Sequence, residues 1–228
     1  MRHLPLLGLV GLAAALAACG GSTQRAAVSA APPAANGASL LDAAPAEKEY
    51  VVDVARSKLE VWSQDIMGGD HRITFGSWRA RVKTEPVPSI AAELEMATAT
   101  LHPPRGTRTL RARLLEVDKF PLSTLEATMK KTGERRGEHL VEGVTELHGV
   151  RKRLRFTGLL TQDGDTFHFV ASFVISRKTF GIRYAPAEPF LKDDVRVVLD
   201  VVAVPASKPP PPPPEPAPEE DAPDDAAR

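Results

Sequence analysis

The residue types that usually carry catalysis or bind metals are few in this chain and far apart. Five histidines lie beyond the N-terminus, and none has the short spacing to another His or Cys that zinc sites require: His71, His102, His139, His148 and His168. The only cysteine is Cys19, which excludes an internal disulfide and a cysteine-built zinc site. We therefore predict no metal site and no cofactor, and we assign the histidines to surface or sheet positions.

Two pairs of carboxylates remain as candidates for acid–base chemistry. Asp163 and Asp165 flank a glycine, and Asp193 directly precedes Asp194. Aspartate is favoured in turns because its side chain bonds to nearby backbone groups, so turns account for both pairs. The chain also lacks the G-x-S-x-G, P-loop and H-E-x-x-H signatures. We predict no catalytic residues and no enzyme activity; an active site would require polar side chains to converge inside the fold.

The element that would position any site is clearest over residues 166–175. Phe167, Phe169, Ala171, Phe173 and Ile175 alternate there with a second, less apolar set. A two-residue period predicts a strand with one apolar face. Three phenylalanines at every second position favour a pleated sheet that faces an enclosed interior.

Weaker alternation recurs before and after this strand. It covers residues 59–61, 75–83, 90–101, 124–130, 140–147, 152–160 and 195–204, with Gly- or Pro-containing turns between several of them. Seven to nine short, evenly spaced strands predict an antiparallel sandwich or barrel. Residues 109–117 instead place Leu110 and Leu114 four positions apart, which predicts one short helix before Pro121.

The N-terminus has the composition of a secretory signal. A basic start is followed by an apolar run over residues 4–18, which is shorter than the roughly twenty residues of a membrane-spanning helix. The run ends Leu16-Ala17-Ala18-Cys19-Gly20, which resembles the bacterial lipoprotein signal box. The resemblance implies cleavage before Cys19 and its acylation; ordinary signal cleavage is the alternative. The residue after the cysteine is Gly20 and not aspartate, which by resemblance to enterobacterial lipoprotein sorting implies a periplasmic protein anchored to the outer membrane.

Composition divides the chain into four parts. We expect a signal peptide at 1–18, a flexible tether rich in Ala, Gly, Ser and Pro at 19–47, a barrel domain at 48–204 and a Pro-rich acidic tail at 205–228. The tail is interpreted as an extended spacer, or else as a docking peptide for a partner or the cell wall. Net charge is zero, and basic residues alternate with acidic ones, which argues against nucleic-acid binding.

The apolar stripes leave the interior open to two interpretations. An eight-stranded barrel is about wide enough to be filled by its own side chains or to hold one slender ligand. A long hydrocarbon ligand requires no polar motif, because each buried CH₂ contributes about 0.8 kcal/mol. Residue types alone therefore do not separate a solid core from a lipid cavity.

Four short motifs in order carry a family resemblance. They are Lys119-Phe120-Pro121, Leu147-His148-Gly149-Val150, the R-x-x-F-G segment within Arg177-Lys178-Thr179-Phe180-Gly181-Ile182, and Asp193-Asp194-Val195. With them, residues 110–202 resemble the bacterial YceI-like family of polyisoprenoid-binding proteins, with a weaker match back to Tyr50. The resemblance implies a lipocalin-like barrel and a long apolar tunnel that holds an isoprenoid chain, in a periplasmic protein without known catalysis.

We therefore expect a mainly β protein: an eight-stranded, antiparallel, lipocalin-like barrel with one short helix and disordered ends. Its expected function is to bind a long-chain isoprenoid lipid of quinone or polyprenyl type, for sequestration or transport in the envelope. Its expected partners are this lipid and the membrane, the latter through acylation of Cys19. The expected ligand-binding residues are Leu114, Leu115, Phe156, Phe167, Phe169, Phe173, Ile175 and Phe180. The alternative is a structural or stress-response envelope protein with a solid-packed barrel and no ligand.

Overall fold

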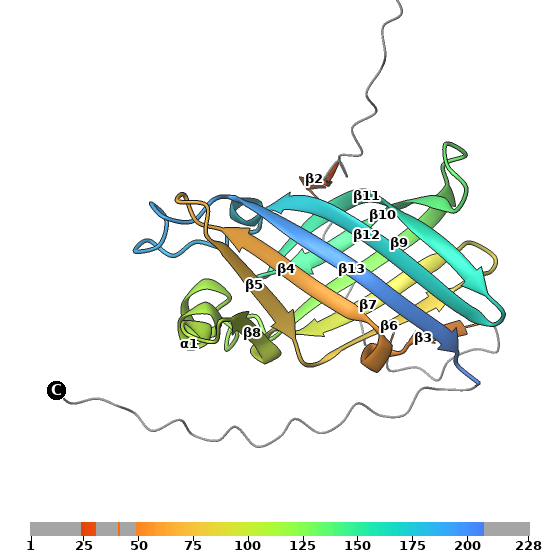
Figure 1. Ribbon diagram of the computed structural model, residues 1–228, viewed down its shortest axis with the longest axis horizontal. Coiled ribbons are helices and arrows are strands. Elements are labelled where there is room, and N and C mark those ends of the chain that lie inside the picture. The colour runs from red at the N-terminus through yellow and green to blue at the C-terminus, as the bar shows by residue number, and fades with distance from the viewer. Residues whose placement is uncertain (1–23, 31–40, 42–48, 208–228) are drawn as a thin grey trace, which may run out of the picture.

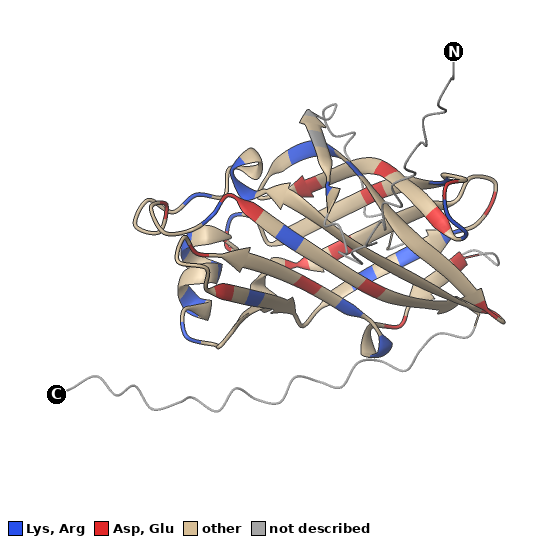
Figure 2. Cartoon of the chain, turned by 45° about the horizontal axis from the view of Figure 1, so that its top comes forward, with Lys and Arg blue, Asp and Glu red and all other residues tan. Residues whose placement is uncertain are grey.

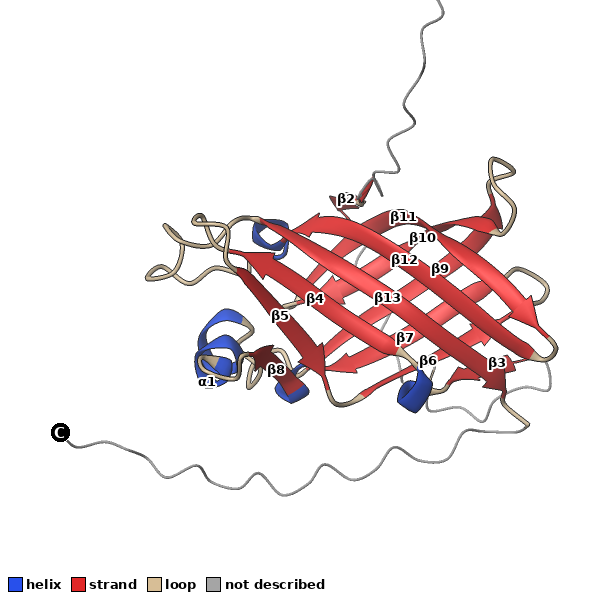
Figure 3. Cartoon of the chain, viewed as in Figure 1, coloured by secondary structure: helices blue, strands red, loops and turns tan. Residues whose placement is uncertain are grey.

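The computed structural model describes residues 24–30, 41 and 49–207. The expected signal peptide, Cys19 and nearly all of the Pro-rich tail lie outside these residues. Regular structure in the described part is mostly β (Figure 3). The strands are β1 (Gln24–Arg25), β2 (Ala27–Ala30), β3 (Glu49–Val52), β4 (Lys58–Gln64), β5 (Asp70–Phe75), β6 (Trp78–Lys83), β7 (Ser89–Glu95), β8 (Ala99–His102), β9 (Leu122–Lys131), β10 (Glu138–Leu147), β11 (Val150–Asp163), β12 (Thr166–Ser176) and β13 (Asp194–Pro205).

The strands close into an eight-stranded antiparallel barrel (Figure 1). We call each of its eight strand positions a wall, because some of them are occupied by two shorter strands in succession. Strands β9 to β13 each form one wall. The other three walls are interrupted strands: β3 with β4, β5 with β6, and β7 with β8. The barrel closes because β13 pairs with β12 on one side and with β3 and β4 on the other. The predicted eight-stranded barrel is confirmed.

The apolar face of β12 points into the barrel, as its alternation predicts. Phe169, Ala171 and Phe173 are buried, whereas His168 and Val170 on the opposite face are exposed. The register carries this face onto β13, where Val197 lies opposite Phe173. The inner surface is therefore a continuous apolar lining built from alternate residues of neighbouring strands.

Helical segments cover one end of the barrel. Helix α1 (Thr107–Thr109) continues into η3 (Leu110–Leu114), and η4 (Arg177–Phe180) lies at the same end, while η1 (Val54–Arg56) and η2 (Met96–Thr98) interrupt walls. The Arg111 guanidinium donates to the Ala99 carbonyl at 2.7 Å, so the helix satisfies part of the free edge of β8. The helix predicted over 109–117 is present but covers 107–114. We call this the helical end and the opposite one the β9–β10 end.

Residues 24–30 fill a split in the wall between β11 and β12. These two strands pair directly only over 159–163 and 166–170. Beyond that, β1 pairs with β12 and β2 pairs with β11. The Gln24 side chain donates to the Thr157 carbonyl at 2.6 Å and accepts from the Thr157 N–H at 3.1 Å. Ala26 donates its N–H to the Val174 carbonyl at 2.7 Å and is only 6% exposed.

Part of the expected tether (19–47) is thus built into the barrel. Strands that separate leave backbone N–H and C=O groups without partners, and residues 24–30 satisfy part of them through their own backbone and the Gln24 side chain. We call residues 24–30 the wall strap. The rest of the expected tether, apart from Leu41, lies outside the described residues.

Candidate functional site: the barrel cavity

A cavity of about 820 Å³ occupies the barrel interior. Its lining includes residues from every wall and from the helical end, and most of the lining side chains are apolar. Protein interiors rarely contain voids much larger than one water molecule, whose share of liquid volume is about 30 Å³. A hollow of this size is therefore a ligand-sized space, within the roughly 300–1,000 Å³ typical of small-molecule sites.

Residue exposure along β13 shows that the middle of the barrel is hollow. Val195 and Ala203, near the two ends of the strand, are buried. Val197, Leu199 and Val201 between them point inward but are only half-buried. Apolar side chains that met at the barrel axis would bury one another, so their remaining exposure is to the cavity. The interior is therefore not packed solid.

All eight residues expected to contact a ligand line this cavity: Leu114, Leu115, Phe156, Phe167, Phe169, Phe173, Ile175 and Phe180. The rings of Phe156 and Phe173 stack with their centroids 4.0 Å apart and 20° between their planes. Phe180 lies on η4 and is 1% exposed. These residues belong to β11, β12 and the helical end, and their role in binding stays a prediction.

The opposite wall contributes lining residues that the sequence reasoning did not select. On β6 and β7 these include Trp78, Ala80, Val82, Ala92 and Leu94. Ala80 lies directly across from Ala92, and two small side chains at this position leave space in the bore. In the sequence, Trp78, Ala80 and Val82 alternate with basic residues and therefore share one face of a strand. This pattern does not reveal a cavity, because an inner face that borders a cavity has the same residue types as one that borders a solid core.

Polar lining residues gather at the two ends of the cavity. Strand pairing places Ser63, His71, Arg177 and Lys192 at the helical end of the lining, and Thr84, Lys131 and His139 at the β9–β10 end. His139 was expected to be a surface or sheet histidine; it is a buried sheet residue that faces the cavity. Lys131 also faces the cavity, because it lies two residues beyond Met129 on the inward face of β9.

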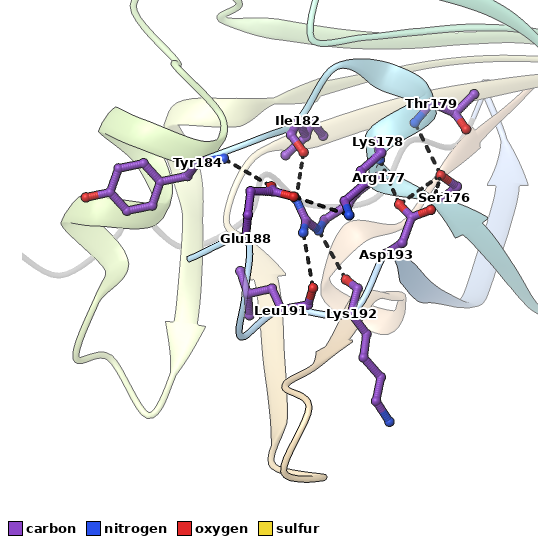
Figure 4. Close-up of polar contacts among 10 residues, drawn as sticks. All are labelled: Ser176, Arg177, Lys178, Thr179, Ile182, Tyr184, Glu188, Leu191, Lys192 and Asp193. Atoms are coloured by element: carbon purple, nitrogen blue, oxygen red, sulfur yellow. Dashed lines mark hydrogen bonds and ion pairs between the residues drawn. The ribbon is translucent and has the colours of Figure 1, made fainter. Parts of the chain in front are cut away.

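Arg177 organises the loop that covers the helical end (Figure 4). Its side chain is buried, and it donates to Glu188 at 2.6 Å and to the carbonyls of Ile182 at 2.8 Å, Lys192 at 3.1 Å and Leu191 at 3.2 Å. A buried guanidinium is tolerated because its donors are paired. The hydrogen bond from Arg177 holds the pKa of Glu188 down from 4.5 to about 2.

Asp193 fixes the start of η4 from across the same loop. Its carboxylate accepts from the Ser176 hydroxyl at 2.8 Å and from the Lys178 N–H at 3.0 Å. Burial raises the pKa of Asp193, but these hydrogen bonds outweigh it, and the net pKa is lowered. This carboxylate therefore has a structural role, consistent with its assignment to a turn.

Residues of the Lys119-Phe120-Pro121 and Leu147-His148-Gly149-Val150 motifs also meet at the helical end. The Phe120 ring packs on His148 with centroids 4.3 Å apart, and His148 lies 3.2 Å from the Glu116 carboxylate. Gly149 has a φ of +69°, and a Cβ there would lie 2.6 Å from the Phe120 ring. Glycine is required at this turn by both its backbone conformation and the ring beside it.

The described residues contain no group of three or more His, Cys, Asp or Glu side chains that could hold a metal ion. Within the same residues, no helix is long and apolar enough to cross a membrane. Charged residues of both signs are distributed around the strands and loops (Figure 2). What the cavity offers chemically is the burial of a long apolar chain between polar ends.

A model of the YceI-like domain matches residues 50–203, from β3 into β13. The chain belongs to the YceI-like family. The barrel of this YceI-like protein resembles the crystal structure of BcnA from Burkholderia cenocepacia, with a TM-score of 0.61 and 19% identity over 67% of this chain and 99% of BcnA. It also resembles a polyisoprenoid binding domain from Saccharophagus degradans, with a TM-score of 0.56 and 13% identity over 68% of this chain and 97% of that domain. At these identities the likeness is one of fold. No curated protein matches the chain.

Proposed function

We propose that this YceI-like protein binds a long-chain isoprenoid lipid, of quinone or polyprenyl type, inside its barrel and sequesters or transports it in the cell envelope. The observation that carries the proposal is the apolar cavity of about 820 Å³ along the barrel. The Saccharophagus degradans neighbour is a polyisoprenoid binding domain, and its likeness in fold supports the same class of ligand here.

The energetics of hydrocarbon burial suit such a ligand. Each CH₂ removed from water contributes about 0.8 kcal/mol, so one five-carbon isoprene unit contributes about 4 kcal/mol before losses of ligand entropy. A few units in the bore are enough for tight binding without any specific polar contact. The half-buried inner face of β13 argues against the alternative of a solid-packed structural barrel.

We also propose that the protein binds without catalysis. The carboxylates Asp163 and Asp165 lie at the β11–β12 turn, and Asp194 pairs with Arg25 at 2.8 Å. Asp193 and Glu188 hold the loop at the helical end. Each of these groups has a structural explanation outside the apolar bore.

Analysis of the bound lipid tests the carrier function. The protein is purified after expression in its native envelope, extracted with organic solvent, and the extract is quantified by mass spectrometry. We expect about one prenyl lipid per chain. A protein that is fully folded but carries no stoichiometric lipid, and takes none up from prenyl-lipid vesicles, would count decisively against a carrier.

The proposed location in the envelope has its own test. We propose acylation at Cys19 and anchoring to the outer membrane, on the resemblance of residues 16–20 to the lipoprotein signal box. Radiolabelled palmitate should be incorporated into the wild-type chain and not into Cys19→Ser. The variant should move from the membrane fraction to the periplasmic extract; an unchanged distribution would contradict anchoring through this residue.

A further inference from the structure

We infer that the cavity mouth at the β9–β10 end binds the anionic headgroup of the ligand, a phosphate or diphosphate monoester at the end of an isoprenoid chain. The inference rests on the proposed carrier function and specifies the headgroup, which that function leaves open. It begins with Lys131, the last residue of β9. Lys131 shares the inward face of β9 with Leu125 and Met129, and all three line the cavity. The apolar stripe of this strand therefore ends in an ammonium group at the rim.

Among the described residues, Lys131 has no counter-ion. Its Nζ makes no ion pair or hydrogen bond with any described residue, whereas Lys130 on the outer face lies 3.8 Å from the Glu142 carboxylate. Lys131 is exposed at the rim, and the cavity lining inward of it, from Met129 on, is mostly apolar. A cleft with such walls focuses the field of a charge at its mouth and attracts ions of opposite sign.

His139 provides a second polar group at the same mouth. It lies directly across from Lys131 on β10, lines the cavity and is 7% exposed. Side chains in such cross-strand positions have Cβ atoms about 4.5–5.5 Å apart. His139 Nδ1 is 2.9 Å from the Gly137 carbonyl oxygen, which can only accept, so Nδ1 carries the proton.

The remaining ring nitrogen of His139 suits a phosphate. In the neutral imidazole, Nε2 accepts from a protonated phosphate oxygen; in the imidazolium, it donates to an ionised one. No residue in the described ranges is hydrogen-bonded to this atom. Lys131 and His139 can therefore address different oxygens of a single phosphate group.

The hairpin between β9 and β10 adds further positive charge around the mouth. It carries four basic residues against two acidic ones over residues 130–138: Lys130, Lys131, Arg135 and Arg136 against Glu134 and Glu138. This excess of two positive charges is local to the hairpin, because Asp163 and Asp165 lie at the β11–β12 turn of the same barrel end.

The helical end does not offer the same site. Arg177 is already paired with Glu188 at 2.6 Å, and His71 lies 3.4 Å from the Asp65 carboxylate. Lys192 donates to a neighbouring glutamine side chain. An anion at this end would have to displace these partners, and the carboxylates of Glu188 and Asp65 would repel it. The anionic headgroup is therefore favoured at the β9–β10 end, with the chain running inward from it.

The test compares three ligands that share one geranylgeranyl chain: the monophosphate, the alcohol and the menaquinone. Each displaces N-phenyl-1-naphthylamine from the mature full-length chain carrying Cys19→Ser, which removes competing acyl groups. Inorganic phosphate alone is a fourth arm. The variants are Lys131→Gln and, as matched control, Lys130→Gln, which removes the same charge from the outer face of the same strand.

We expect the monophosphate to bind about fivefold more tightly than the alcohol or the quinone at low salt, the value of one partly exposed charged contact. Lys131→Gln should remove this advantage and leave alcohol binding unchanged, and Lys130→Gln should retain it. Equal affinities for the three ligands, or an equal loss for all of them in Lys131→Gln, would overturn the headgroup inference and leave the carrier intact. If inorganic phosphate displaces the dye at the same concentration, the site binds free anions and not a prenyl headgroup, and the headgroup inference is overturned. If none of the three prenyl ligands binds, the carrier function itself fails.

Discussion

Replacing Ala92 with phenylalanine should obstruct the bore without unfolding the barrel. Ala92 lines the cavity from the wall opposite the phenylalanines and faces Ala80 across the strands. The added ring occupies about the space of one isoprene unit, whose burial contributes about 4 kcal/mol gross. Because a displaced chain keeps part of its contacts, we take about half of this value. A loss of about 2 kcal/mol weakens binding roughly 30-fold.

The same substitution tests whether the interior is hollow. In a cavity the new ring gains contacts, so the melting temperature should stay the same or rise. In a solid core the ring would cost about 1–3 kcal/mol by overpacking, which lowers the melting temperature by at least 2–4 °C in a domain of about this size. Affinity is measured by geranylgeraniol displacement of N-phenyl-1-naphthylamine, and stability by thermal unfolding of the ligand-free protein.

Val170→Phe is the matched control, because Val170 lies on the outer face of β12 and is 40% exposed. It adds a comparable ring outside the bore and should leave affinity unchanged. Wild-type affinity in Ala92→Phe, or a lower melting temperature in Ala92→Phe alone, would refute the reasoning from the cavity.

Three further predictions address the wall, the loop and the strap. Phe173→Ala removes a stacked ring from Phe156 and should lower the free energy of unfolding by about 3 kcal/mol, measured by urea denaturation; a loss below 1 kcal/mol would contradict its place in the packed wall. Because the folded-state pKa of Glu188 is lowered to about 2 from 4.5, this carboxylate contributes stability above pH 4.5 that is lost as the pH falls toward 2. Urea midpoints of Glu188→Gln should accordingly change less over that pH range than those of the wild type, and parallel curves would exclude the ion pair as the cause. Gln24→Ala should speed amide hydrogen exchange at Thr157, because the Thr157 N–H donates to the Gln24 side chain. Amides that pair β11 directly with β12 serve as the unchanged reference. Equal protection of Thr157 in both proteins would mean that the strap is not bound there in solution.

The barrel could be predicted because strand alternation depends on local residue types. In β12 every second residue is apolar, and the structure buries that face. Whether such a face packs against other side chains or borders a cavity depends on the distance between opposite strands of the barrel. Residue types do not indicate this distance. Val197 is half-buried and Val195 is buried on one face of the same strand.

Two features could not be predicted for different physical reasons. The wall strap has the composition of a linker, and it becomes ordered only because β11 and β12 separate and leave backbone groups to pair. The cavity mouth depends on register: Lys130 and Lys131 are identical in type, and only the inward position of Met129 indicates which of them faces the bore.

The predicted helix ends earlier than its leucine spacing suggests, and Glu116 beyond it has a φ of +45°.

The wall strap also sets how closely the barrel is held to its proposed anchor. Gln24 is five residues beyond Cys19 in the sequence. Because a fully extended chain advances at most about 3.6 Å per residue, the two residues can be no more than about 18 Å apart. If Cys19 is acylated as proposed, this short connection would hold the barrel at the bilayer surface with the seam between β11 and β12 near the membrane. A prenyl chain that leaves the membrane would then reach the side of the barrel first, at the seam where the wall strap lies between β11 and β12. The strap would therefore control entry of the lipid through this seam.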